Sequence, residues 1–345
     1  MNKRHYIIPI FISHIGCPHQ CVFCNQDKIA KEVEKEVTDK DVRNTIEEYL
    51  KTINHNNSTV EVSFFGGTFT AINVNKQKEL LSVAKEYKDK GLINKIRMST
   101  RPDAINGYIL NYLKEYSVDI IELGVQSLDN EILKLSGRGH TAKHVEEASK
   151  LIKEYNFTLG HQIMPGLPGD TFEKDIETVK KSISMKPDIC RIYPALVIKD
   201  TPMELMYHRG EYKPYSLEEA VSISKELYKL YVDAGVKIIR IGLQPTENIT
   251  WGGDLVDGPF HPSFRELVEG SLICDNIKRE IKEDEDIIIE INSKDLSKLY
   301  ANKKVYFNNL KNNHTGKILV NTKDKLKRGN LNIIIIKRTK EINIG

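Results

Sequence analysis

Short runs of β-branched and aromatic residues alternate along the chain with longer segments in which apolar positions recur every three or four residues. The short runs predict strands and the longer segments predict helices. Strands are expected at 6–12, 59–65, 94–100, 119–126, 157–164, 188–197 and 236–243. Helices are expected at 38–53, 75–90, 105–116, 142–155, 171–184 and 217–234.

This regular alternation of strand and helix predicts an α/β fold with parallel strands joined by right-handed crossovers. Six or seven such units suit a partial or a complete barrel, and a doubly wound sheet is an alternative that periodicity does not exclude. In each of these architectures the functional side chains are expected just after the carboxyl ends of the strands.

A segment rich in glycine and proline, Trp251–Ser263, indicates a domain boundary. We expect a main domain over 1–265 and a small α/β domain over 271–345. In the small domain the pattern predicts a strand at 286–291, helices at 294–299 and 305–310, and strands at 317–322 and 331–337.

The composition is that of a globular protein, since 40% of the 345 residues are hydrophobic and 29% are charged. It excludes disordered and collagen-like chains. No apolar run approaches the roughly 20 residues that a membrane-spanning helix needs, and Tyr6–Ile12 is too short for a signal-peptide core. We therefore expect a cytoplasmic protein with no membrane partner.

The charge is unevenly distributed. From Ser271 to the end, sixteen basic and ten acidic residues give a net charge of +6, whereas the whole chain carries +3. A basic domain favours a polyanionic partner. An ordinary solvated surface is the other interpretation, and charge alone does not exclude it.

Three of the five cysteines, Cys17, Cys21 and Cys24, are spaced CxxxCxxC directly after the first predicted strand. In a cytosolic chain such a cluster points to metal binding or catalysis rather than disulfides. Three thiolates on one loop can hold a [4Fe–4S] cluster and leave one iron open for a substrate or cofactor. A zinc site with His14 or His19 is the alternative, but zinc usually takes paired cysteines from two separate turns.

The segments that follow make the chain resemble the radical S-adenosylmethionine (SAM) superfamily over about residues 6–265. In family order they are 65–70 (FGGTFT), 99–103 (STRPD), 122–127 (ELGVQS), 137–141 (GRGHT) and 164–171 (MPGLPGDT). Two further segments, 191–198 (RIYPALVI) and 212–220 (YKPYSLEEA), are similar to the radical-SAM half of the Elongator catalytic subunits.

This resemblance implies a partial (β/α)6-type barrel and an enzyme that cleaves SAM reductively to a 5′-deoxyadenosyl radical. It implies a [4Fe–4S] cluster on Cys17, Cys21 and Cys24, and a reductant of the flavodoxin or ferredoxin type. It carries SAM contacts over to the following positions: Gly66, Gly67, Thr68, Ser99, Arg101, Gln126, Arg138 and Gln162. It names no catalytic side chain on the substrate.

By the same resemblance, the backbone of Gly66 and Gly67 approaches the methionine part of SAM, and Arg138 binds its carboxylate. Gln126 binds the ribose or the carboxylate. Ser99 and Gln162 stand where relatives often carry carboxylates, which weakens those two assignments. Arg101 has two interpretations, a SAM contact or a structural ion pair with Asp103.

The small domain is similar to a degenerate KH-like RNA-binding module over Glu290–Leu310. The loop that clamps the nucleic-acid backbone in such modules falls at Ala301–Lys304, where both glycines are missing. Lys303 and Lys304 can still contact phosphates. A small capping domain without an RNA role is an equally open interpretation.

The resemblance and the basic domain together favour RNA, and within RNA tRNA, as the substrate, with a small metabolite as the runner-up. A non-catalytic RNA-binding or assembly protein with an iron–sulfur or zinc site is the alternative of another class. The Elongator subunits continue into an acetyltransferase domain, and about 75 residues after Ser271 are too few for that fold. Five further residues can face a substrate, although no spacing rule selects them: Tyr193, Lys199, Arg240, Gln244 and His261.

Overall fold

The computed structural model describes residues 4–12, 17–25, 36–54, 58–246 and 248–336. The chain divides into two compact units, Met1–Pro262 and Ser263–Gly345. The division falls at the end of the glycine- and proline-rich segment, and residues 264–270, ahead of the small domain expected from 271, belong to the first helix of the second unit. Each unit is described by itself below.

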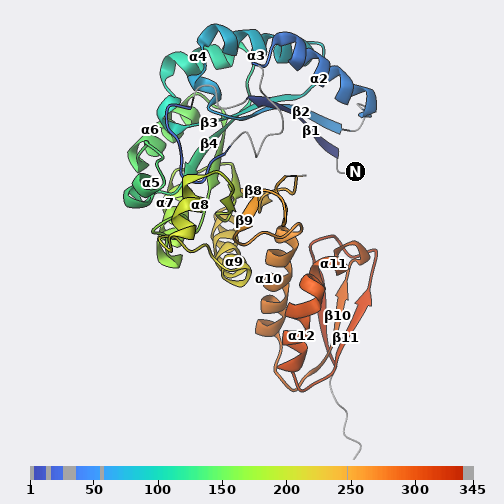
Figure 1. Ribbon diagram of the computed structural model, residues 1–345. Coiled ribbons are helices and arrows are strands. Elements are labelled where there is room, and N and C mark those ends of the chain that lie inside the picture. The colour runs from blue at the N-terminus through green and yellow to red at the C-terminus, as the bar shows by residue number, and fades with distance from the viewer. Residues whose placement is uncertain (1–3, 13–16, 26–35, 55–57, 247, 337–345) are drawn as a thin grey trace, which may run out of the picture. The chain divides into compact units, whose positions relative to one another are not determined.

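The first unit is built on a seven-stranded sheet with helices along one of its faces (Figure 1). The strands are β1 (Arg4–Ile12), β2 (Ser58–Gly66), β3 (Lys95–Thr100), β4 (Ile120–Gln126), β5 (Thr158–Ile163), β6 (Ile189–Ile192) and β8 (Lys237–Ile241). The helices are α2 (Asp39–Thr52), α3 (Val74–Asp89), α4 (Gly107–Glu115), α5 (Asn130–Leu135), α6 (Ala142–Glu154), α7 (Phe172–Ser184), α8 (Pro202–His208) and α9 (Leu217–Asp233).

All seven strands are parallel, and their order in the sheet is their order in the chain. A doubly wound sheet reverses its order at an internal strand, so that alternative is wrong. In the described part of the chain β1 and β8 do not pair, and the sheet stays open. The predicted partial barrel is therefore confirmed, and all strand carboxyl ends lie along one edge.

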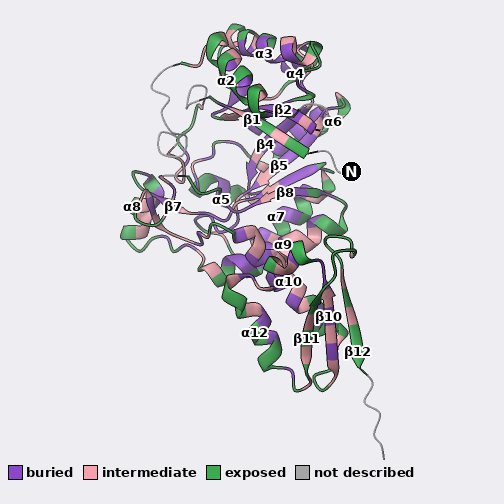
Figure 2. Cartoon of the chain, turned by 90° about the vertical axis from the view of Figure 1, so that its right-hand side faces the viewer, coloured by how far each residue is buried: buried purple, intermediate pink, exposed green. Residues whose placement is uncertain are grey.

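The strands are largely apolar because helices pack against one face of the sheet. In β4 the residues Ile120, Ile121, Leu123 and Val125 are all at most 3% exposed. Figure 2 shows β4 and β5 largely in the buried colour and the helices α2 and α3 with exposed outer faces. Helix α2 begins with a capping box, since the Thr38 and Asp41 side chains each accept a hydrogen bond from the other's backbone N–H.

The strand predicted at 188–197 is interrupted. Strand β6 ends at Ile192, although the Tyr193 and Ala195 N–H groups still donate to the Ile163 and Pro165 carbonyls, and the next strand is β7 (Val197–Ile198), which pairs with β9 (Leu255–Asp257). Pro194 explains the break because proline has no N–H for the ladder of a central strand. Tyr193 follows Arg191 by two residues, so the alternation of the strand carries both side chains to the inner face, where both line the cavity.

The loop after β5 is held by two tyrosines from the segment before α9. The Tyr212 hydroxyl donates to the Gly166 carbonyl at 2.7 Å, and the Tyr215 hydroxyl donates to Asp175 Oδ2 at 3.0 Å. Gly166 has a φ of +81°, and a Cβ there would lie 2.7 Å from the Tyr215 ring. The loop conformation therefore depends on glycine and on these two contacts.

Two carboxyl groups meet under this loop. Burial and the nearby Asp170 carboxylate raise the pKa of Asp175 to about 9, and burial also raises the pKa of Asp170. Asp175 is 4% exposed, so its ionised form is poorly solvated. At neutral pH the pair holds a proton that the unfolded chain releases.

The second unit packs helices against a mixed three-stranded sheet. Its helices are α10 (Phe264–Glu280), α11 (Leu296–Leu299) and α12 (Val305–Asn312), and its strands are β10 (Asp286–Ile291), β11 (Ile318–Thr322) and β12 (Leu331–Ile336). Strand β10 is central, parallel to β11 and antiparallel to β12. The predicted elements are present, and α10 is an additional helix that the sequence pattern did not indicate.

The loop between α11 and α12 has an unusual backbone. Asn302, Lys303 and Lys304 all have left-handed φ values, between 51° and 68°. Such a conformation is costly for residues with a Cβ atom. Glycine is the residue type that normally adopts it, so the loop keeps a glycine-like path without the two glycines of a KH loop.

We expect Asp175→Asn to change how stability depends on pH. The folded-state pKa of Asp175 lies above its unfolded value, so stability is fully present below the unfolded pKa of about 4 and falls as pH rises toward about 9. The variant removes this loss. Between pH 5 and 8, its free energy of unfolding should fall less steeply with pH than that of the unmodified chain, by at most about 1.4 kcal/mol per pH unit.

Urea unfolding at several pH values measures this difference. Asp233→Asn is the matched control because Asp233 is exposed at the end of α9 and should leave the slope as it is. Parallel pH profiles for Asp175→Asn and the unmodified chain would contradict a shared buried proton.

Candidate functional site

The cysteine segment follows β1 and is pinned at Val22. The Val22 N–H donates to the Ser136 carbonyl at 3.1 Å, and the Val22 carbonyl accepts from the Met203 N–H at 2.9 Å. A turn then brings the Cys24 N–H within 3.1 Å of the Cys21 carbonyl. Cys21 is buried, whereas Cys17 and Cys24 are half-buried. The backbone of the segment is thus fixed by the end of α5 and the start of α8.

Two of the three sulfur atoms have a hydrogen-bonding side chain beside them. Thr68 Oγ1 lies 3.2 Å from Cys17 Sγ, and Arg138 Nη1 donates to Cys21 Sγ at 3.3 Å. Cysteine ligates metal as the thiolate, and hydrogen-bond donors are suitable neighbours of such an anion. The buried Nε of Arg138 has no hydrogen-bond partner among the described residues. The hydrogen-bond donors of Thr68 and Arg138 therefore fit cysteine ligands of a metal group, and the unpartnered Nε of Arg138 fits a further anionic ligand.

The Gly66–Gly67 turn sits at the carboxyl end of β2. Gly66 has a φ of +106°, and a Cβ there would lie 2.3 Å from the Ile12 carbonyl oxygen. The Gly67 N–H donates to that same oxygen at 2.7 Å. Only glycine permits this close approach, which ties the end of β2 to the end of β1, just ahead of the cysteines.

Arg101 and Arg138 belong to one cluster. Arg101 forms a two-point ion pair with Asp103, with both N–O distances 2.9 Å, and its Nη2 also donates to the Arg138 carbonyl. Both interactions position the backbone that carries Arg138. Arg138 in turn donates through Nη2 to the Gly124 carbonyl at 2.6 Å. Burial and these two cations lower the pKa of His140 to about 3, so His140 stays neutral.

The two predicted glutamines lie side by side at neighbouring strand ends. Gln162 Nε2 donates to Gln126 Oε1 at 3.5 Å, a long hydrogen bond. Gln126 has a left-handed φ of +65°, a strained conformation that turns the chain at the end of β4. Ser99, at the same edge on β3, is half-buried.

These groups line one cavity of about 310 Å³ inside the sheet. It is lined by all three cysteines and by all eight predicted SAM contacts: Gly66, Gly67, Thr68, Ser99, Arg101, Gln126, Arg138 and Gln162. Of the five predicted substrate-facing residues only Tyr193 lines it, and the cavity wall does not include Lys199, Arg240, Gln244 and His261. The structure brings the predicted residues together, and the part that each plays toward a ligand stays a prediction.

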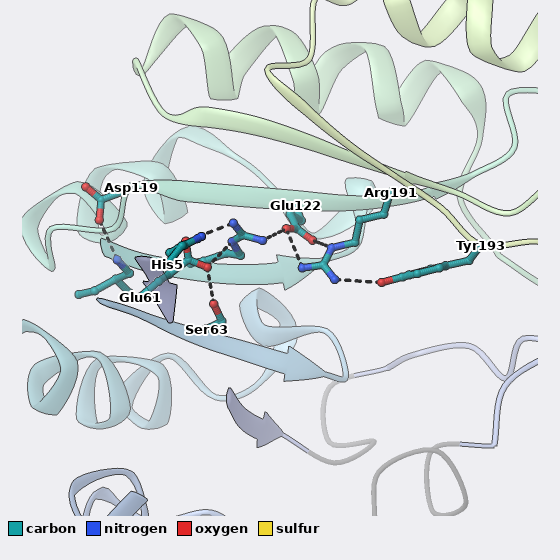
Figure 3. Close-up of polar contacts among 9 residues, drawn as sticks. His5, Glu61, Ser63, Asp119, Glu122, Arg191 and Tyr193 are labelled. Atoms are coloured by element: carbon teal, nitrogen blue, oxygen red, sulfur yellow. Dashed lines mark hydrogen bonds and ion pairs between the residues drawn. The ribbon is translucent and has the colours of Figure 1, made fainter. Parts of the chain in front are cut away.

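The sequence reasoning missed a row of charged residues on the inner face of the sheet (Figure 3). Arg97 Nη1 lies 2.5 Å and Arg191 Nε 2.8 Å from the Glu122 carboxylate. Arg97 Nε lies 2.8 Å from Glu61 Oε1, and Arg191 Nη1 donates to the Tyr193 hydroxyl at 2.9 Å. Charged residues in otherwise apolar parallel strands are the signal that would have revealed this row.

The zinc alternative had named two histidines. His19 lines the cavity, and His14 lies outside the described residues. Among the residues that the structure describes, no three His, Cys, Asp or Glu side chains surround the position of a single metal ion. No described helix is both long and apolar enough to cross a membrane.

Comparison with known proteins identifies the family. The model of the radical SAM superfamily matches residues 11–181, and the model of the radical SAM C-terminal domain matches residues 187–273. Together these two matches cover the cysteine segment, the cavity and the whole sheet of the first unit from Phe11 onward.

Similar proteins include the tRNA uridine(34) acetyltransferase of Methanocaldococcus infernus, 31% identical over 255 residues, or 63% of this chain and 48% of that protein. Human Elongator complex protein 3 is 30% identical over 56% of this chain and 39% of its own length. The chain thus spans about half the length of the curated relatives that it matches. The solved structure of M. infernus Elp3 lacking residues 1–46 matches 82% of this chain and 65% of its own, with a TM-score of 0.60 and 24% identity.

We expect Gly66→Ala to lower the free energy of unfolding by more than about 2 kcal/mol, roughly the strain of a positive φ plus displacement of Ile12. Gly91→Ala is the matched control because Gly91 has a φ of +71° but no atom within 4 Å of the added Cβ. That control should cost only about 1 kcal/mol.

Urea unfolding of both variants measures the difference. Equal losses of stability for the two variants would mean that the close approach to Ile12 contributes nothing and that only the positive φ matters.

Proposed function

Because the chain belongs to the radical SAM superfamily, we propose that it is an enzyme that cleaves S-adenosylmethionine reductively on a [4Fe–4S] cluster held by Cys17, Cys21 and Cys24. The family uses this cluster and SAM as its cofactors. The observation that carries the proposal is that three cysteines and eight predicted SAM contacts line one cavity. When bound, the cluster supplies the electron that breaks a carbon–sulfur bond of SAM.

The residues of this chain would bind and orient these cofactors. Thr68 and Arg138 already have their polar atoms at two of the sulfurs, so they would stabilise the thiolates. The unpartnered Nε of Arg138 supports the assignment of this residue to the SAM carboxylate. The Gly66–Gly67 backbone would bind the methionine part, and Gln126 with Gln162 would bind the ribose.

Arg101 takes an indirect role in this proposal. It is 4% exposed, and Asp103 and the Arg138 carbonyl occupy its guanidinium. Such an arginine positions Arg138 more readily than it binds a ligand. Ser99, which carries no charge where relatives often have a carboxylate, would contribute at most a neutral hydrogen bond to SAM.

The reaction needs an electron donor, and we propose a reductant of the flavodoxin or ferredoxin type. We place the reaction in the cytoplasm because free cysteines and an iron–sulfur cluster persist in a reducing compartment. Both statements rest on the chemistry of the cluster.

We propose RNA, and within RNA tRNA, as the substrate. The names of two similar proteins support it, since one is a tRNA uridine(34) acetyltransferase and another is Elongator complex protein 3. We do not propose acetyl transfer for this chain, although the name tRNA uridine(34) acetyltransferase includes it. A small metabolite is the alternative substrate.

The second unit supports an RNA substrate through its charge distribution. At the carboxyl end of β10 the loop 323–330 folds back, with the Asn292 side chain donating to the Asp324 and Leu326 carbonyls. Lys294, Lys325 and Lys327 are exposed at this end of the unit, and none of them pairs with a carboxylate among the described residues. Unpaired lysines held on an ordered backbone suit phosphate contacts.

We expect Cys21→Ala to abolish both cluster and SAM cleavage. Anaerobic reconstitution of the unmodified chain should give brown protein with about four irons and release 5′-deoxyadenosine on reduction with SAM. Cys274→Ala is the control, since Cys274 is buried in the second unit and should keep both properties. A colourless, zinc-loaded unmodified chain would overturn the enzyme proposal.

We expect the triple variant Lys294→Glu/Lys325→Glu/Lys327→Glu to bind labelled tRNA more weakly. The slope of the logarithm of the binding constant against the logarithm of the salt concentration should become less negative, by up to about 0.9 for each phosphate that the variant no longer neutralises. Fluorescence anisotropy at several salt concentrations measures both quantities. Lys282→Glu/Lys311→Glu/Lys317→Glu changes the charge equally at three other sites of the same unit and serves as control. Equal weakening by both triples would argue against a defined RNA surface.

A further inference from the structure

Several residues that line the cavity have no part in holding SAM or the cysteines as proposed above. Among them are Phe11, Phe65, Glu122, Arg191 and Tyr193. They come from β1, β2, β4 and β6 and from the chain just after β6. Figure 3 shows Glu122, Arg191 and Tyr193 in one continuous row of polar contacts.

Each of the three guanidinium nitrogens of Arg191 donates a hydrogen bond. Its Nε and Nη2 donate to the two oxygens of Glu122 at 2.8 and 3.3 Å, and its Nη1 donates to Tyr193 Oη at 2.9 Å. The Arg191 side chain is 12% exposed and that of Glu122 4%. Burial lowers the pKa of Arg191, but Glu122 and Tyr193 raise it by more, so the guanidinium stays charged.

The charge of Arg191 is cancelled inside the sheet. Glu122 also pairs with Arg97, and Arg97 pairs with Glu61, so two carboxylates balance two guanidinium groups along the row. His5, which is 44% exposed, lies 3.2 Å from Glu61 at the far end of the row. It adds a positive charge to the row only when it is protonated. An anion entering beside Arg191 would lose its hydration without finding an unpaired cation.

Tyr193 keeps one unused donor. Its oxygen accepts from Arg191, which leaves the phenolic hydrogen free, and no described residue accepts that hydrogen. Tyr193 is half-buried in the cavity wall. A hydroxyl held in this way can donate its hydrogen to an acceptor in the cavity, and a ligand carbonyl can supply one.

Flat groups line the same cavity. The Arg191 guanidinium lies over the Phe65 ring, 5.3 Å from its centre, and the Phe11 ring centre is 6.3 Å from that of Phe65. Aromatic rings and guanidinium planes are the surfaces on which unstacked nucleobases pack.

We propose that Glu122, Arg191 and Tyr193 form the substrate-selecting wall of the cavity, which takes an uncharged planar group with a carbonyl acceptor and rejects anions. This inference rests on the proposed function, and it places a nucleobase, rather than a phosphate, against Tyr193. Tyr193 contacts the substrate, whereas Glu122 and Arg191 are positioning residues. Gly160 leaves room for this arrangement, since a Cβ there would lie 2.6 Å from Glu122 Cγ.

The charge-balance part of the inference is tested without RNA or SAM. Glu122→Gln keeps the shape of the side chain but leaves Arg191 uncompensated, so inorganic phosphate should now bind and raise the melting temperature at constant ionic strength. The unmodified chain and the double variant Glu122→Gln/Arg191→Gln should show no such rise. A phosphate response already present in the unmodified chain would overturn the exclusion of anions.

The Tyr193 contact is tested with reconstituted enzyme and RNA from a strain that lacks the gene. Tyr193→Phe removes one hydrogen bond, so the KM for RNA in 5′-deoxyadenosine formation should rise about tenfold, with a much smaller change in kcat. Tyr228→Phe, on α9 and outside the cavity wall, is the matched control and should keep the KM of the unmodified chain.

The outcomes separate the inference from the proposed function. If the KM for SAM rises as much as that for RNA, or if neither changes, Tyr193 does not select the substrate. If RNA has no effect on the unmodified enzyme, the RNA substrate fails instead, while the phosphate experiment still decides whether the wall is charge-neutral. Should Glu122→Gln fail to fold, Tyr193→Phe carries the test, because it removes only a hydroxyl.

Discussion

The geometry of the first unit depends on one constraint, the parallel pairing of seven strands in chain order. Every strand then delivers its carboxyl end to the same edge, whatever the distance in sequence. Cysteines after β1, glycines at the end of β2 and glutamines from β4 and β5 meet there for this reason. The contact between Gly67 and the Ile12 carbonyl shows how closely two such ends are joined.

The inner face of the sheet has two levels of different chemistry. Glu61, Arg97, Glu122 and Arg191 form a buried, charge-balanced row within the strands. The predicted cofactor contacts lie nearer to the carboxyl ends of the strands or just after them. Burying four charges is costly unless each is paired, and here each one is. The pairing fixes the orientation of Arg191 and, through it, that of Tyr193.

The two units divide the proposed work between them. The first carries the cavity and a mildly acidic surface, whereas the second has its own core and the excess of basic residues. A cavity that is electrically neutral at Arg191 suits a base, and exposed unpaired lysines suit a phosphate backbone. Under the proposed function, a base would bind in the cavity of the first unit and a phosphate backbone would contact the lysines of the second.

The sequence by itself determined the strand–helix order, the partial barrel by resemblance and the set of cysteines, glycines and glutamines at the cavity. The strand–helix order and the cysteine set follow from local features, a period of two or 3.6 and a short spacing of thiols, whereas the glycines and glutamines, like the barrel, came from the resemblance. Tertiary structure alone decided that Arg101 pairs with Asp103, that Arg191 donates to the Tyr193 hydroxyl, and that Glu122 balances both Arg97 and Arg191. The contacts of Glu122 join residues on different strands, and which of them meet depends on strand register and on the direction of side chains across the sheet, which no local pattern encodes.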